Sequence, residues 1–178
     1  MLGSREAIPS NITFDQAITL TQSLLSQMAA AELQPNEIES AIAQLVKSEN
    51  GARGFFVTYL TSEQELADNP SPEVVRALQS SPEIVAELLV KNLAMSAAMA
   101  VTHRQDEAMA QNSERVRSRT VHLIQLVQLP AVGELSQQIW ESAATGEGNY
   151  KAFLQRWGYD AEQRQVICQA LAQVLPKN

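Results

Sequence analysis

The sequence has little cysteine, few aromatic residues and no excess of positive charge. One cysteine, Cys168, occurs among 178 residues, so no internal disulfide can form. The apolar residues around Cys168 predict a buried thiol in a reducing compartment. Aromatic residues make up 5% of the chain, and 13 basic residues face 20 acidic ones for a net charge of −7. Because this charge repels phosphate backbones at long range, we expect no nucleic-acid binding.

Signals for export or membrane insertion are also scarce. Residues 1–11 contain one arginine, one glutamate and no apolar run that resembles a signal-peptide core, so we expect a flexible N-terminal segment there. The longest apolar region, 84–101, is interrupted by Glu87 and Lys91, whereas a membrane span needs about 20 largely uncharged residues. We therefore expect a soluble, cytoplasmic protein without a transmembrane helix. The length and the lack of a linker predict one domain, 1–178.

Signals for the start of a helix recur along the chain. The capping-box spacing, in which a polar residue and a glutamine three positions later cap each other, occurs at two places: Thr13 with Gln16, and Asp160 with Gln163. Pro35 stands where the first residue of a helix would, before a helical apolar pattern. The echo of Ser71-Pro72-Glu73 in Ser81-Pro82-Glu83 predicts two consecutive helix starts, each capped by its serine.

The middle of the chain predicts one helix surrounded by others. No glycine or proline occurs from Glu83 to Leu129, and the stretch from Pro82 to His103 is apolar on almost every side. We place a break near residues 111–113 and further helices over 134–144, 150–157 and after 160. The sequence therefore predicts an all-α fold, a compact bundle of about seven or eight helices around the Pro82–His103 helix.

Residues 51–60 are ambiguous. The segment 55–60 has strand-like propensity, but no second segment of this character exists to pair with it, so we favour a short buried helix over an extended strand. Residues 51–54, Gly-Ala-Arg-Gly, predict a turn between helices. A weaker alternative is an anion site, because backbone N–H groups and an arginine at a helix start can bind a phosphate or carboxylate.

A metal site is the first catalytic hypothesis. His103, Asp106 and Glu107 have the spacing at which an imidazole and carboxylates on one helix can approach the same ion. Helical metal sites draw ligands from more than one helix, and the sequence has only two histidines. We therefore favour the exposed end of the central helix, with His103 and Glu107 as a pair on one face, and expect no bound metal or cofactor.

Two further groups of residues are candidate binding sites. Arg115, Arg119 and His122 share a helix face opposite the apolar stripe, and neither arginine has a carboxylate three or four positions away. They predict a solvated face, ion pairs with the acidic first half of the chain, or a patch that binds an acidic protein or an anion, with Arg117 paired to Glu114 beside it. The second group is aromatic and predicts core packing or the edge of a ligand groove: Trp140, Tyr150 and Trp157.

These observations favour a function that depends on binding. Helix signals are abundant and no catalytic constellation stands out, so we expect a non-enzymatic interaction or regulatory module with a protein partner or self-association, such as a homodimer. One alternative is a small-molecule-binding bundle that uses the methionine-lined centre and the aromatic group. The other is a metal-assisted enzyme at His103, Asp106 and Glu107.

Overall fold

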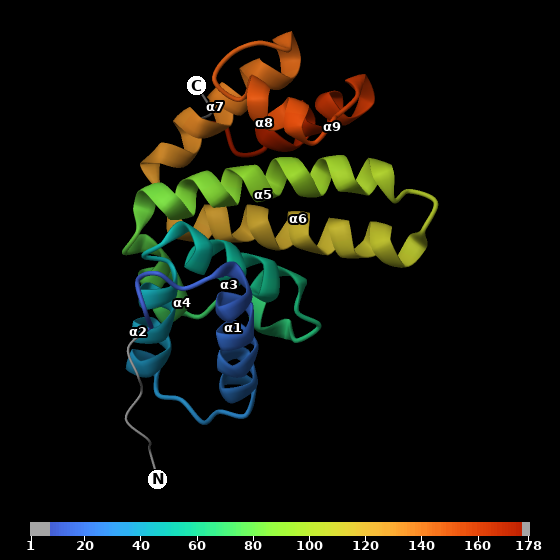
Figure 1. Ribbon diagram of the computed structural model, residues 1–178. Helices are drawn as coiled ribbons and strands as arrows, with labels where there is room; N and C mark the ends of the chain where they lie inside the picture. The colour runs from blue at the N-terminus through green and yellow to red at the C-terminus, as the bar shows by residue number, and fades with distance from the viewer. Residues whose placement is uncertain (1–7, 176–178) are drawn as a thin grey trace. The chain divides into compact units, whose positions relative to one another are not determined.

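The structure is a computed structural model that describes residues 8–175, and this range contains nine α-helices, one 3₁₀ helix and no strand (Figure 1). The prediction of an all-α, multi-helix fold is therefore confirmed. The contacts divide the chain into two compact units, residues 1–85 and 86–178, with the boundary inside one helix. The single domain over 1–178 stays a prediction.

The first unit contains four helices, one 3₁₀ turn and the start of a fifth helix. The bounds are α1 Phe14–Ala29, α2 Pro35–Leu45, α3 Glu49–Thr61, η1 Glu65–Ala67, α4 Pro72–Gln79 and the beginning of α5, Pro82–Thr102. Helix α1 packs along α3, and α2 packs along α4. The aromatic residues of α3 form the centre of this unit, where the rings of Phe55 and Tyr59 stack with centroids 5.0 Å apart.

Local signals fix most helix starts in this unit. Thr13 and Gln16 form the predicted capping box, and Pro35, Pro72 and Pro82 each stand at the beginning of their helix. One expectation is wrong, because Ser71 does not cap α4. Its hydroxyl oxygen is instead buried, and no partner for it is found among residues 8–175.

Helix α3 corrects the interpretation of residues 51–54. These residues lie inside the helix, not in a turn, and the Ser48 side chain caps the helix by accepting a hydrogen bond from the backbone N–H of Gly51 at 3.1 Å. The guanidinium of Arg53 lies 5.0 Å from the centre of the Phe14 ring. The helix start therefore packs against α1, and the predicted short buried helix over 55–60 is confirmed and extends further.

The second unit contains most of α5 and four further helices: α6 Glu107–Val127, α7 Pro130–Thr145, α8 Lys151–Arg156 and α9 Ala161–Ala172. Helix α5 is largely buried, as expected for a central helix. Its side chains with at most 2% exposure are Val85, Ala86, Leu89, Val90, Leu93, Ala94, Ala97 and Ala98. By length and composition α5 could cross a membrane, and half of its most apolar stretch is buried inside the structure.

The break between α5 and α6 lies at residues 103–106, not near 111–113 as predicted. The Asp106 side chain caps α6 by accepting a hydrogen bond from the backbone N–H of Met109 at 3.2 Å, and α6 continues through 111–113. His103 precedes this cap and Glu107 follows it, so the two do not share a helix face.

Helices α7, α8 and α9 form the C-terminal part of the second unit, where α7 packs against both α8 and α9. The predicted capping box of Asp160 and Gln163 begins α9. Gln163 has a second role, because its Nε2 donates to Thr102 Oγ1 at 2.9 Å and to the carbonyl of Ala98 at 3.3 Å. This side chain thus ties the start of α9 to the end of α5.

Candidate functional site

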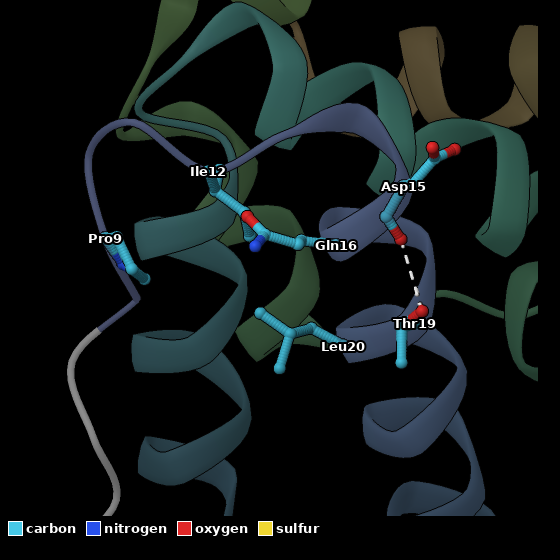
Figure 2. Close-up of a pocket in the computed structure, with 6 residues that line it drawn as sticks. All are labelled: Pro9, Ile12, Asp15, Gln16, Thr19 and Leu20. Atoms are coloured by element: carbon cyan, nitrogen blue, oxygen red, sulfur yellow. Dashed lines mark hydrogen bonds between the residues drawn. The ribbon is translucent and has the colours of Figure 1, made fainter.

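A hollow of about 440 Å³ lies in the first unit beside α1 (Figure 2). Six residues line it: Pro9, Ile12, Asp15, Gln16, Thr19 and Leu20. In Figure 2 the side chains of Ile12, Gln16 and Leu20 extend from the start of α1 and the segment before it into the same space. Because the hollow is open to solvent, it can admit a side chain that belongs to another molecule.

Local hydrogen bonds hold the walls of this hollow in place. The backbone N–H of Ile12 donates to the carbonyl of Pro9 at 3.2 Å and closes a turn before the helix. The backbone N–H of Ile8 donates to Gln44 Oε1 at 2.9 Å, which ties this segment to α2. Gln16 is fixed by its capping box, so the shape of the hollow follows from residues that are already constrained. The expectation of a flexible segment 1–11 falls largely on residues 1–7, which lie outside the described residues.

The surface of the hollow combines apolar and polar groups. Ile12 is buried with 3% exposure, whereas Leu20 is 40% exposed. Thr19 Oγ1 donates to the carbonyl of Asp15 at 3.2 Å, which occupies that hydroxyl within the helix. An exposed leucine beside a buried isoleucine gains free energy when an apolar group covers it, so the hollow favours an apolar ligand group.

The charge of the chain is concentrated in the unit that contains the hollow. Residues 1–85 hold four basic and eleven acidic side chains, whereas residues 86–178 hold nine of each. Among residues 8–175, Asp15 is the only charged residue that lines the hollow. The first unit therefore attracts cations, and a ligand that places positive charge near its apolar group is favoured there.

The three residues of the predicted cationic patch differ in exposure. Arg119 is buried with 4% exposure, Arg115 is half-buried and His122 is exposed. A solvated face that carries all three is therefore wrong, whereas ion pairs with the acidic first half and binding through Arg115, Arg119 and His122 stay predictions. The pairing of Arg117 with Glu114 is present, with 2.6 Å between Nη2 and Oε2.

The predicted metal ligands do not assemble. Asp106 accepts the capping hydrogen bond of α6, and Glu107 accepts a hydrogen bond from Gln111 Nε2 at 3.3 Å. No group of three or more His, Cys, Asp or Glu side chains that could hold a metal occurs between residues 8 and 175.

The predicted groove aromatics lie in different environments. Tyr150 packs edge to face with Phe153, and the ammonium of Lys91 lies 5.9 Å and 5.4 Å from the centres of these two rings. Lys91 also pairs with Glu87 at 2.9 Å. Burial raises the pKa of the Tyr150 hydroxyl, and the nearby Glu87 carboxylate raises it further. Tyr150 thus belongs to a packed cluster between α5 and α8.

The other two groove aromatics, Trp140 and Trp157, stand apart from that cluster. Trp140 is half-buried, and its carbonyl accepts a hydrogen bond from the Cys168 thiol at 3.7 Å. Trp157 is 51% exposed. Cys168 is half-buried, which is less than expected. This burial raises the pKa of its thiol, and the charge of Arg164 lowers that pKa by a smaller amount.

The hollow was not predicted from the sequence. Its signal was Leu20, an apolar residue of α1 that lies off the helical face formed by the other apolar residues of that helix. An apolar side chain off the buried face is common on protein surfaces, so Leu20 alone could not distinguish a binding site. The turn formed by residues 9–12 creates the other wall, and no spacing rule predicts it.

Comparison with known proteins places the chain in a family. No curated protein and no solved structure matches the sequence. A family profile matches residues 13–174, which include all of α1 through α9 but not Pro9 and Ile12, the first lining residues of the hollow. The chain belongs to the family described as "Uncharacterised conserved protein UCP020893".

Proposed function

We propose that the chain is a non-enzymatic interaction module whose first unit binds a cationic, amphipathic segment of a partner protein. The hollow lined by Ile12 and Leu20 supports this proposal, because it offers an open apolar surface on the acidic part of the chain. A segment that inserts an apolar side chain there and places lysine or arginine around it matches both properties.

A single helix of the partner is the simplest ligand. Residues at positions i and i+4 of a helix lie on one face, so two apolar side chains can contact Leu20 and Ile12 while the flanking positions stay exposed. Cations at the flanking positions then face a unit with eleven acidic side chains. Their attraction is screened by salt over about 8 Å at physiological ionic strength, so binding weakens as salt is added.

The volume of about 440 Å³ also falls within the range of small-molecule pockets. Such pockets place a few polar groups so that they converge on the ligand. In this hollow the Thr19 hydroxyl and Gln16 Oε1 are both engaged in hydrogen bonds at the start of α1, and Asp15 carries a charge. The lining therefore favours an apolar side chain with a cation beside it over a polar metabolite.

The test uses a fluorescently labelled peptide of leucine and lysine, about 15 residues long, with the leucines on one helical face. We expect fluorescence anisotropy to show binding in the micromolar range at low salt. The substitution Leu20→Arg fills the hollow with a cation, and we expect it to weaken binding about tenfold, which corresponds to about 1.4 kcal/mol.

The matched control is Leu126→Arg, which makes the same charge change at an exposed leucine of the second unit. Equal weakening by both variants would mean that general charge, and not the hollow, determines binding. A peptide of leucine and glutamate with the same pattern should bind at least tenfold more weakly, and tight binding of that peptide would contradict the proposed selectivity.

A further inference from the structure

Trp157 is an exposed apolar side chain in the second unit. Its side chain is 51% exposed, more than any other large hydrophobic residue that the structure describes. It caps the short helix α8 and is followed by Gly158, whose φ of 64° ends the helix. A Cβ atom on Gly158 would meet no atom within 4 Å apart from those of its chain neighbours, so the backbone next to Trp157 faces open space.

The neighbour of Trp157 is a cation. The guanidinium of Arg156 lies 5.9 Å from the centre of the Trp157 ring, and Arg156 pairs with no carboxylate among residues 8–175. Tryptophan and arginine are the residues that most often dominate the binding energy of protein interfaces. The pair therefore presents an apolar group with an adjacent positive charge.

This combination is the chemistry that the hollow of the first unit favours. We propose that Trp157 and Arg156 of one copy of the chain bind in the hollow of a second copy, an inference that rests on the proposed function. The indole covers the exposed surface of Leu20, and Arg156 then lies against the acidic first unit of that copy.

Other exposed apolar side chains match the hollow less well. They are Val57, Met99, Met109 and Leu126, with exposures from 37% to 43%. None of them has an arginine or lysine as its chain neighbour. Trp157 alone among the exposed large hydrophobic residues of the described chain combines a large ring with an adjacent cation, so it is the side chain we assign to the hollow.

The proposed contact joins two different surfaces, so it is heterologous. In a pair of copies, one copy keeps a free hollow and the other keeps a free indole. Further copies can therefore bind at either end as the protein concentration rises. One side chain and its neighbours cover far less than the roughly 1,200 Å² of a stable interface, so we expect weak association that is sensitive to salt.

Sedimentation velocity over a series of protein concentrations at low salt tests this contact. We expect the mean mass of the parent protein to rise with concentration, and Trp157→Ala and Leu20→Arg each to stay monomeric. An equimolar mixture of the two variants should form a heterodimer, because one retains the indole and the other retains the hollow. Growth should end at the dimer, since neither remaining surface is functional.

The outcomes separate this inference from the proposed function. A parent protein that stays monomeric but binds the leucine–lysine peptide overturns self-association and leaves the proposed function standing, whereas failure of both assays overturns both. Self-association of Trp157→Ala equal to that of the parent, or a mixture that stays monomeric, also overturns the inference. Circular dichroism confirms that each variant is folded, and Leu126→Arg should associate like the parent.

Discussion

A Cβ atom on Gly54 of α3 would lie closer to the Cβ of Ala17 in α1 than real Cβ atoms ever approach. The same position is 3.0 Å from the backbone nitrogen of Ile18 and from the carbonyl oxygen of Phe14. The obstructing atoms are therefore mostly backbone, which cannot move as a flexible side chain can. Helices α1 and α3 cross at a separation that only glycine permits, and this crossing positions the wall of the hollow.

Gly54→Ala is therefore expected to destabilise the protein. Alanine gains about 1 kcal/mol of helix propensity over glycine, but overpacking at a close crossing costs about 1–3 kcal/mol or more, and backbone obstruction places this site at the upper end. We expect a net loss of about 1–2 kcal/mol in the free energy of unfolding, measured by urea denaturation. Asn50→Ala, at an exposed position of the same helix, is the control and should change stability little. A stabilised Gly54→Ala variant would contradict the close crossing.

Gln163→Ala removes a residue that acts at two places. It eliminates the hydrogen bond that Gln163 Oε1 accepts from the backbone N–H of Asp160 and the hydrogen bonds to Thr102 and Ala98, whereas the Asp160 side chain still caps the helix. Each lost hydrogen bond costs about 0.5–1.5 kcal/mol. We expect about 1–2 kcal/mol of destabilisation by urea denaturation. Gln165→Ala, an exposed glutamine of the same helix, should have almost no effect, and an equal loss there would show that the contacts of Gln163 are not responsible.

The parts of the fold that were predicted correctly are the helix starts, which depend on interactions between residues close together in the sequence. The capping boxes at Thr13 and Asp160 and the prolines at 35, 72 and 82 specify helix starts through bonds within a few residues, so they can be recognised without tertiary information. The break between α5 and α6 was misplaced because polar residues cover both 103–106 and 111–113. Only the cap formed by Asp106 distinguishes them.

The errors at candidate sites arise from tertiary packing. Arg119 lies on a polar helix face by spacing, yet the fold buries it, and burial of one position in a helix depends on neighbours that the local pattern does not specify. Gly51 and Gly54 predict a turn by propensity, yet both lie inside helix α3. Gly51 packs closely against the end of α2 and Gly54 against α1, and neither contact leaves room for a Cβ atom. The hollow likewise depends on a turn that brings residues 9–12 beside α1.

Cys168 should react slowly with alkylating reagents. Burial raises the pKa of its thiol, so a smaller fraction is present as the reactive thiolate near pH 8. We expect iodoacetamide to modify the folded protein more slowly than the urea-unfolded protein at the same pH. Because the charge of Arg164 lowers this pKa, Arg164→Gln should slow the reaction further. An unchanged rate in that variant would remove the electrostatic contribution of Arg164.

Tyr159 should make the folded protein less stable at alkaline pH. Burial raises the pKa of its hydroxyl from 10.0 to about 12, because the phenolate is poorly solvated in the folded state. Between pH 10 and 12 the unfolded chain loses this proton while the folded chain retains it, so the stability contributed by the neutral hydroxyl is present below pH 10 and declines as the pH rises towards 12. Tyr159→Phe should therefore show a smaller loss of stability over this range, measured by urea denaturation. In that variant, the absorbance of the phenolate band should lack the component that titrates near pH 12 in the parent protein. Loss of a component that titrates near pH 10 instead would show that Tyr159 is solvated.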